Sequence, residues 1–278
     1  MRAAAIQLNS DEDAARNLRA ADELTRAAAA DGATLIVLPE KWNGLGLGRG
    51  AMERVAEPID GPAIAWARAT ARELGVDIVA GSIAERRAGR DKLSNTSVHI
   101  GPDGELAATY RKIHMFDVVV DGHEYRESET EEPGDEIVVS PLADGTELGM
   151  TVCYDLRFPE LFRILAVRGA RVIALPAAFT KATGRAHWEV LVRARAIENQ
   201  AFVVAADQCG FHPPGDRESF GGSLIVDPWG EVLARAGDEP SFIAADLDLE
   251  RQHAVRSELP SLANRMPGAY RWPESVHA

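Results

Sequence analysis

The chain has 278 residues, of which 46% are hydrophobic and 26% are charged, which is ordinary globular usage. This length suits one layered α/β domain over residues 1–278. The formal net charge of −13 argues against a nucleic-acid-binding surface, because contacts to phosphate need clustered Lys and Arg. No stretch reaches the roughly 18 apolar residues of a membrane-spanning helix, and the first residues lack the apolar core of a signal peptide, so we expect a cytoplasmic protein without a membrane partner.

The first half of the chain alternates strand-like and helical segments. Ala14, Leu18 and Ala21 begin a series of apolar residues at helical spacing, and Pro62 suits the first turn of a helix because it has no amide hydrogen to lose. Gly and Pro within residues 101–104 predict the turn of a hairpin. The predicted elements are a strand over 3–8, a helix opened by Asp11, a strand over 34–38, a helix from Pro62, a strand over 76–81, and hairpin strands over 95–100 and 106–110.

The second half repeats this order and also ends in a hairpin, whose predicted turn is Asp-Pro-Trp-Gly at residues 227–230. A tail over about 248–278 completes the chain, with a helix after Asp248 and an irregular segment to Ala278. The predicted elements are a strand over 149–153, a helix over 159–168, a strand over 172–175, a helix over 187–199, a strand over 202–206, and hairpin strands over 224–226 and 232–234.

Strands separated by helices predict mostly parallel pairing, with hairpins at the edges of the sheets. Two such halves predict a sandwich of two packed sheets with helices outside. Residues 40–61 and 112–135 show no clear period, and long irregular segments in a compact domain usually carry function. We therefore expect the functional site to include these two segments.

Cys153 is the first candidate for a chemical role. It ends an apolar run, and Pro159 opens a helix shortly afterwards. A strand-to-helix turn exposes the side chain at its apex and directs free backbone amides toward it, which favours a thiolate. The alternative is a buried core cysteine. Cys209 is the second of only two cysteines, too few for a secreted disulfide framework or a thiolate metal site.

Glu40 and Lys112 also follow strand-like runs. The carboxyl ends of central strands are where α/β sheets place their chemistry, so a carboxylate at this position is a candidate base. The alternative for Glu40 is a solvated loop glutamate paired with Lys41. The alternative for Lys112 is an ordinary surface lysine, so each residue alone is a weak signal.

Together these segments resemble the nitrilase superfamily of carbon-nitrogen hydrolases, whose catalytic set is glutamate, lysine and cysteine in this chain order. The resemblance extends from the first strand to the turn at 227–230, and it implies an α/β fold of the four-layer αββα type and a homodimer or larger homo-oligomer. The motifs that carry it are Leu38-Pro39-Glu40, Tyr110-Arg111-Lys112-Ile113-His114, Cys-Tyr-Asp-Leu-Arg-Phe-Pro-Glu at 153–160, Ala-His-Trp-Glu at 186–189 and Arg-Ala-Arg-Ala-Ile-Glu-Asn at 193–199.

The resemblance implies a role for each member of this set. Glu40 would take the proton of Cys153, return it to departing ammonia and then activate water. Lys112 and the backbone amide of Tyr154 would hold the oxyanion. This chemistry requires neither a metal nor another cofactor.

Members of the superfamily also carry a second glutamate that contacts the lysine. Glu127 is the best positional match, and Glu124 and Glu129 are nearby alternatives. A carboxylate beside Lys112 would keep the lysine protonated and correctly aimed. The sequence leaves the choice among these three glutamates open.

Within the superfamily the chain resembles the amidase branch that includes ω-amidase and deaminated-glutathione amidase, whose substrates are small molecules with a terminal amide and a carboxylate. In that branch the arginine four residues after the cysteine, here Arg157, pairs with the substrate carboxylate, which suits a guanidinium group. Phe179 and Thr183 match further pocket positions. The alternatives are a structural pair of Arg157 with Glu160 or Asp155, a core Phe179 and a loop Thr183.

Two residues depart from the pattern of the branch. Arg185 stands where proline is usual, and Gly222 stands where histidine is common before Ser223. Arg185 either adds a second contact to an anionic substrate or faces solvent. The exact acid therefore stays open, and an N-carbamoyl amino acid or a nitrile is the alternative substrate.

Other classes of function fit the sequence less well. His187 and Glu189 have the spacing of a zinc deaminase, but the Pro-Cys-x-x-Cys partner motif is absent from the sequence. A Cys-His hydrolase has no favoured base among the scattered histidines, and Cys153 lacks flanking glycines. A non-catalytic scaffold of the same fold and a redox role for Cys153 are the remaining alternatives.

Overall fold

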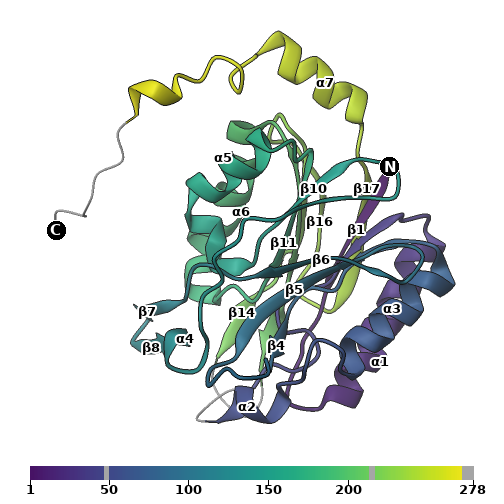
Figure 1. The fold of residues 1–278 in the computed structure, drawn as a ribbon, viewed down its shortest axis with the longest axis vertical. Coiled ribbons are helices and arrows are strands. Elements are labelled where there is room, and N and C mark those ends of the chain that lie inside the picture. Colours follow the sequence, from purple (N-terminus) through teal and green to yellow (C-terminus); the bar gives the residue numbers. More distant parts are fainter. Residues whose placement is uncertain (47–49, 213–216, 271–278) are drawn as a thin grey trace.

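The computed structural model describes residues 1–46, 50–212 and 217–270. Two β-sheets pack face to face, and helices cover both outer faces (Figure 1). α1 (Ala14–Ala30) and α3 (Pro62–Leu74) lie on one sheet, whereas α5 (Pro159–Val167) and α6 (Lys181–Asn199) lie on the other. The predicted four-layer αββα sandwich is confirmed.

The two sheets repeat one strand order. The strands are β1 (Arg2–Gln7), β2 (Leu35–Val37), β3 (Asp77–Val79), β4 (Ile83–Glu85), β5 (Ser94–Ile100), β6 (Leu106–Arg111), β9 (Val139–Pro141), β10 (Glu147–Met150), β11 (Val172–Ala177), β12 (Phe202–Asp207), β15 (Leu224–Val226), β16 (Val232–Arg235) and β17 (Ser241–Asp246). In the first sheet β1, β2 and β3 are parallel, and the antiparallel pair β5 and β6 follows. In the second sheet β10, β11 and β12 are parallel, and β15 and β16 follow. The predicted repeat of the two halves is therefore confirmed.

Alternating side chains along the central strands build three apolar layers. In β1, Ala3 and Ala5 face the other sheet, whereas Ala4 and Ile6 face the helices. Successive side chains of a strand point to opposite faces, so a strand buried on both faces has a continuous apolar sequence. The layer between the sheets brings β2 against β11, so that the segments following these two strands meet at one end of the sandwich.

Strand pairing and two element boundaries differ from the prediction. Most ladders between described strands are antiparallel, and parallel pairing is confined to the centre of each sheet, so mostly parallel pairing is wrong. The strand predicted over 149–153 ends at Met150, and Cys153 begins the short 3-10 helix η1 (Cys153–Arg157). α6 begins at Lys181 rather than at 187, because Gly184 does not break the helix: it lets the helix approach Phe220, which a Cβ would meet at 2.3 Å. Thr183 is therefore helical.

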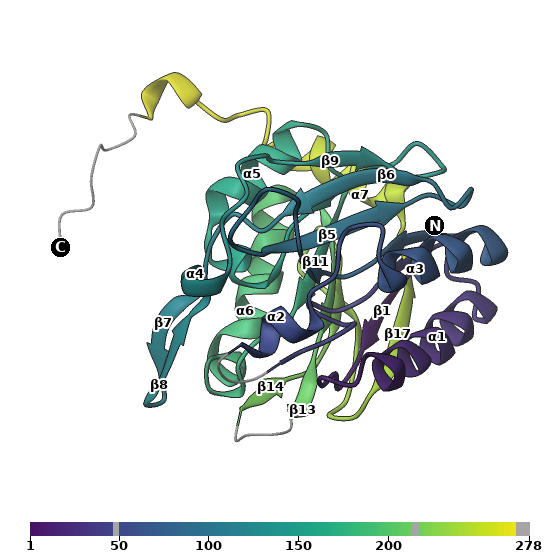
Figure 2. The same ribbon diagram turned by 60° about the horizontal axis from the view of Figure 1, so that its bottom comes forward.

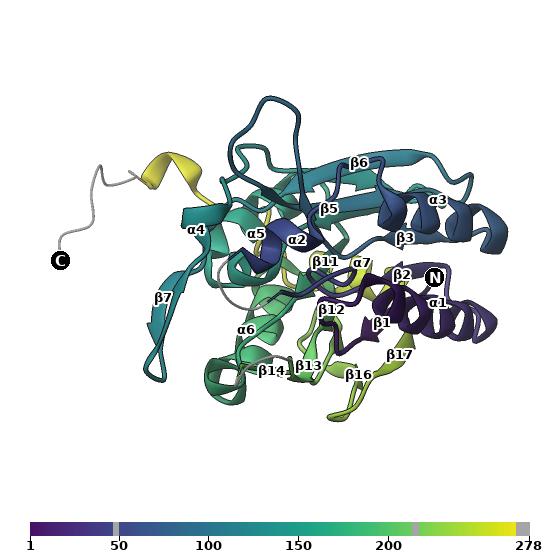
Figure 3. The same ribbon diagram turned by 90° about the horizontal axis from the view of Figure 1, so that it is seen from below.

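Both segments that were expected to be irregular contain short elements. α2 (Ala51–Val55) lies within 40–61, and β7 (Asp117–Val120), β8 (His123–Arg126) and α4 (Glu127–Thr130) lie within 112–135. β7 and β8 form an antiparallel hairpin that projects from the body beside α4 (Figures 2 and 3). A second small hairpin, β13 (Cys209–Phe211) with β14 (Glu218–Phe220), follows β12. Elements this short do not establish a period in the sequence.

The tail of the chain contains one predicted and one unpredicted element. α7 (Leu249–Glu258) follows Asp248 as predicted, and the Asp248 side chain caps it by accepting from the Arg251 amide. β17, which was not predicted, pairs with β1 along its whole length. Beyond α7 the chain leaves the body and includes η2 (Pro267–Ala269) (Figure 1). Residues 271–278 of the expected irregular segment lie outside the described residues.

No helix in the described ranges has the length and apolar character needed to cross a membrane. The interpretation of residues 1–278 as a single domain stays a prediction.

Candidate active site

Glu40, Lys112 and Cys153 lie together at one end of the sandwich. Glu40 follows β2, Lys112 follows β6, and Cys153 follows β10. All three line one cavity of about 820 Å³. The fold therefore brings the ends of strands from both sheets to a common site.

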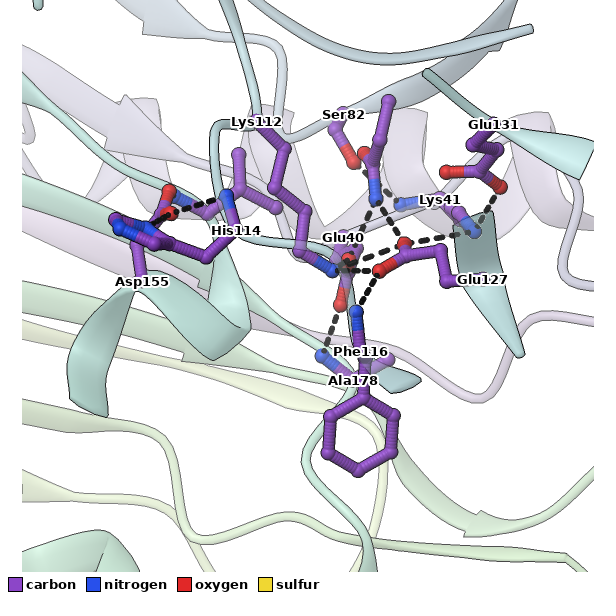
Figure 4. A network of polar contacts seen from close by, with 12 residues as sticks. Glu40, Lys41, Ser82, Lys112, His114, Phe116, Glu127, Glu131, Asp155 and Ala178 are labelled. Atoms are coloured by element: carbon purple, nitrogen blue, oxygen red, sulfur yellow. Dashed lines mark hydrogen bonds and ion pairs between the residues drawn. The ribbon is translucent and has the colours of Figure 1, made fainter. Parts of the chain in front are cut away.

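Glu40 makes contacts with both sheets. Its Oε1 atom accepts hydrogen bonds from Asn95 Nδ2 at 2.7 Å and from Lys112 Nζ at 3.2 Å, and its Oε2 atom accepts from the Ala178 amide at 2.9 Å (Figure 4). The Cys153 thiol is close enough to this carboxylate for the charge of Glu40 to raise the thiol pKa. Glu40 is 4% exposed, so it is not the solvated loop glutamate of the alternative interpretation.

Lys112 is buried between two carboxylates and is 2% exposed, which excludes an ordinary surface lysine. Its Nζ atom donates to Glu127 Oε1 at 2.9 Å and to Glu127 Oε2 at 2.8 Å, in addition to Glu40. Burial lowers the pKa of Lys112, but the negative charges of Glu127 and Glu40 outweigh burial and hold this pKa well above its usual value. Lys112 is therefore a fixed cation.

Glu127 is the glutamate that the structure brings to Lys112. Burial raises the pKa of its carboxyl, but Lys112 and Lys41 outweigh burial and hold the pKa well below its usual value. The Phe116 amide donates to Glu127 Oε2 at 2.7 Å. Glu124 is exposed and pairs with the neighbouring Arg126, and Glu129 is exposed as well.

Cys153 has a left-handed backbone conformation, with φ of 48°. Residues other than glycine rarely adopt this region, and they concentrate at functional sites. Cys153 is 8% exposed, and burial, followed by the charge of Glu40, raises the pKa of its thiol well above the usual value, although Lys112 opposes this. Burial and Glu40 therefore favour a protonated thiol and oppose the thiolate that the turn alone favours, which fits the expected role of Glu40 as the base.

Asp155 anchors the turn that carries Cys153. Its buried carboxylate accepts hydrogen bonds from the Tyr110 hydroxyl at 2.6 Å, from His114 Nδ1 at 2.7 Å and from the Val152 amide at 2.8 Å. Tyr110 and His114 belong to the segment that surrounds Lys112, so Asp155 ties the two segments together. Sequence reasoning treated Asp155 only as a partner for Arg157 and missed this role.

Three of the four predicted substrate-binding residues line the cavity, namely Tyr154, Phe179 and Thr183. Arg157 is not among the described lining residues. Its guanidinium carbon lies 5.2 Å from the centre of the Phe179 ring and 6.0 Å from that of Tyr154, and Nη1 donates to His187 Nδ1 at 3.3 Å. Arg157 thus lies behind two aromatic rings of the cavity wall.

The structural alternatives for these residues have separate outcomes. No carboxylate of the described ranges forms a salt bridge with Arg157, so its expected pair with Glu160 or Asp155 is absent there. Phe179 belongs to the apolar core and also lines the cavity, and its contact with substrate stays a prediction. Thr183 lies on α6, not in a loop.

Arg217 is a cation of the cavity wall that sequence reasoning missed. Its guanidinium carbon lies 4.7 Å from the centre of the Tyr125 ring. Arg185 is exposed and lines a second cavity of about 340 Å³, which shares Tyr125, Thr180, Arg217 and Glu218 with the first. No signal in the sequence connects Arg217 with the distant β8.

Gly222, the other departure, has φ of 62°, and its carbonyl accepts a hydrogen bond from Trp188 Nε1 at 2.9 Å. Glycine adopts this conformation without strain, whereas a side chain there would be unfavourable.

Comparison with known proteins identifies the family. Residues 2–257 match the carbon-nitrogen hydrolase family. The chain is 39% identical over 273 residues to the deaminated glutathione amidase of Bos taurus, covering 96% of this chain and 82% of the relative. It is 39% identical over 276 residues to the omega-amidase NIT2 of Danio rerio, covering 97% of this chain and 96% of the relative.

Its fold is similar to the crystal structure of the C. elegans NitFhit protein, with a TM-score of 0.90 and 35% identity. The match covers 97% of this chain and 66% of that chain, so this chain spans just under two thirds of its length. These findings agree with the resemblance in the catalytic motifs. The protein belongs to the carbon-nitrogen hydrolase family and is a hydrolase of non-peptide carbon-nitrogen bonds.

Proposed function

We propose that the protein is a cysteine-dependent amidase that converts the terminal amide of a small carboxylate-bearing molecule to a carboxylate and ammonia. The observation that carries this proposal is the buried Glu40 carboxylate, which contacts Lys112 and the Ala178 amide and lines the same cavity as Cys153. The names of two relatives, deaminated glutathione amidase and omega-amidase, support the substrate class. Deaminated glutathione and the ω-amide of a 2-oxo acid are the substrates that we expect.

In the acylation step Glu40 takes the thiol proton as the sulfur of Cys153 attacks the amide carbon. The carbonyl π electrons move to oxygen, and the resulting oxyanion is held by Lys112 and the backbone amide of Tyr154. When the intermediate collapses, the carbon-nitrogen bond breaks and Glu40 returns the proton to nitrogen. Ammonia leaves, and a thioester to Cys153 remains.

In the deacylation step Glu40 takes a proton from water, and the water oxygen bonds to the thioester carbon. The carbon-sulfur bond then breaks, Cys153 recovers its proton from Glu40, and the acid product loses a proton to solvent. Lys112 stabilises the second oxyanion as it did the first. Glu127 acts through Lys112, whose charge and direction it maintains.

The nucleophile is tested by replacing each cysteine separately. We expect Cys153→Ala to lower kcat by more than roughly 1,000-fold, because the thioester cannot form. Cys209→Ala is the matched control: Cys209 is buried outside the residues that line the cavity, and burial raises the pKa of its thiol to about 12. The measurement is ammonia release from 2-oxoglutaramate, deaminated glutathione, an N-carbamoyl amino acid and a nitrile. Turnover by a folded Cys153→Ala protein, or no release by the wild type from any compound, contradicts the proposal.

The second glutamate is tested with three matched substitutions. Glu127→Gln removes the largest of the charge effects that raise the pKa of Lys112, so that pKa falls and Lys112 loses its proton at a lower pH. We expect kcat to fall roughly 100-fold and the alkaline limb of the kcat/KM profile to move to lower pH. Glu124→Gln and Glu129→Gln should leave both quantities unchanged. The assignment of Glu127 fails if either control loses as much activity.

The arginine that binds the substrate carboxylate is identified by replacing two candidate arginines separately. The motif resemblance supports pairing of Arg157 with a substrate carboxylate, but its guanidinium lies behind the Tyr154 and Phe179 rings and does not line the cavity. We expect Arg157→Gln to raise KM roughly 10- to 100-fold for a carboxylate-bearing ω-amide and to leave a neutral amide of similar length unaffected. Arg217→Gln is the matched variant, because Arg217 lines the cavity directly. If only Arg217→Gln raises KM selectively, Arg217 is the carboxylate partner and Arg157 is not.

We also propose a homodimer or larger homo-oligomer formed through α5 and α6. Both helices expose large apolar side chains, with Ile164 and Val167 on α5 and Val190 and Ile197 on α6. Exposed apolar patches of this kind mark association surfaces. Light scattering should give at least twice the 30.0 kDa of one chain, and Val190→Asp should lower the mass. A monomeric wild type contradicts the proposal. The cytoplasmic location stays a prediction.

A further inference from the structure

A second lysine-glutamate pair adjoins the site and has no role in the mechanism above. Lys41 Nζ lies 2.5 Å from Glu131 Oε1 and 3.6 Å from Glu127 Oε1 (Figure 4). The side chain of Lys41 is 9% exposed and that of Glu131 is 1% exposed. Because both side chains line the cavity, this pair belongs to the same buried charge cluster as Lys112.

The pair completes a series of alternating charges. Starting from the thiol, the series runs through Glu40, Lys112, Glu127, Lys41 and Glu131. Without Lys41, the two carboxylates and one ammonium of the proposed mechanism carry a net charge of −1. Lys41 brings the sum over these four side chains to zero, and ionisation of Glu131 makes it −1 again. Buried charges are tolerated when opposite charges in contact with them compensate them.

The backbone holds Lys41 in this place. It directly follows Glu40 and has φ of 51°, a conformation that residues other than glycine rarely adopt. The Lys41 amide donates to Ser82 Oγ at 3.0 Å. On the other side, the Glu131 amide donates to the Glu127 carbonyl at 2.9 Å, so one turn of helix presents both carboxylates to Lys41.

We propose that Lys41 is a positioning residue for the amidase reaction. Lys41 supplies Glu127 with a second cation, and this cation keeps Glu127 ionised and in contact with Lys112 through both oxygens. Glu131 holds the Lys41 ammonium in reach of Glu127. This inference rests on the proposed function. A structural ion pair is the competing explanation, and under it the loss of either partner has the same effect.

The two explanations differ in what each partner does to Glu127. Lys41 lowers the pKa of Glu127, so its removal raises that pKa and Glu127 accepts a proton at a higher pH. Glu131, whose own pKa burial raises to about 7, repels Glu127 electrostatically, so its removal does not raise the pKa of Glu127. The charged and titratable groups that face Glu127 are Lys41, Lys112, Glu40, Glu131 and Asp117.

The experiment compares Lys41→Met, Lys41→Arg and Glu131→Gln in the full chain, with 2-oxoglutaramate as substrate. We expect Lys41→Met to lower kcat roughly 10- to 100-fold with a smaller change in KM, and to move the acid limb of the kcat/KM profile to higher pH. Lys41→Arg should restore most of the activity, because the charge is kept. Glu131→Gln removes the negative charge of the pair but keeps an oxygen that can accept from Lys41 Nζ, so it should leave kcat within roughly threefold and the acid limb unmoved or lower.

Equal losses in Lys41→Met and Glu131→Gln with the same pH profile, or a Lys41→Met protein with wild-type kinetics, overturn the inference. If Lys41→Met does not fold, Lys41→Gln takes its place with the same expected outcomes. Alkylation of Cys153 by iodoacetamide gives a second readout that needs no turnover: Lys41→Met should slow it and Glu131→Gln should not. If the wild type shows no turnover, the proposed function is wrong. If the wild type is active and the Lys41 variants have the same kinetics, only this inference is wrong.

Discussion

A buried ammonium between two carboxylates is the interaction on which the rest of the site depends. Lys112 donates to both Glu40 and Glu127 and has almost no contact with solvent. Removing one partner from such a group leaves an uncompensated buried charge, which costs several kcal/mol, so the three side chains are held in place as a unit. Because they follow β2 and β6 or begin α4, this unit also joins the strand ends of the first sheet to the irregular segment that walls the cavity.

The sandwich makes this arrangement possible. Its middle layer consists of small and branched apolar side chains from both sheets, such as Ala5 of β1 and Ala174 of β11, which let the sheets approach closely. The ends of β2 and β11 then meet, and the Ala178 amide that follows β11 reaches the Glu40 carboxylate. Charges as buried as Glu40 and Lys112 interact more strongly than in bulk water, so fixed dipoles and ions there can stabilise an oxyanion effectively.

Much of this was predictable from the sequence, because the central strands are buried on both faces and their apolar runs end at Glu40 and near Cys153. The motif resemblance then supplied Lys112 and three candidates for the second glutamate, of which Glu127 is the one that contacts Lys112. Other features depend on contacts between distant segments and leave no local signal in the sequence. These are the pairing of β17 with β1, the ion pair of Lys41 with Glu131, and the position of Arg217 in the cavity wall. The expectation of a thiolate considered only the local turn, and it omitted the burial and the remote charge that raise the thiol pKa.

A protonated resting thiol fits the charge balance of the cluster. In the proposed mechanism the charges of Glu40 and Glu127 balance those of Lys41 and Lys112, and no positive charge of these four is left over to stabilise a thiolate. The sulfur in this mechanism keeps its proton until an amide carbonyl stands beside Lys112. Sulfur attack then converts one negative charge at Glu40 into one negative charge at the oxyanion, and the net charge of the buried cluster does not change. The thiol form is also the less susceptible to oxidation and alkylation, since the thiolate is the reactive species. The same charge balance therefore protects the free cysteine and allows its activation when substrate binds.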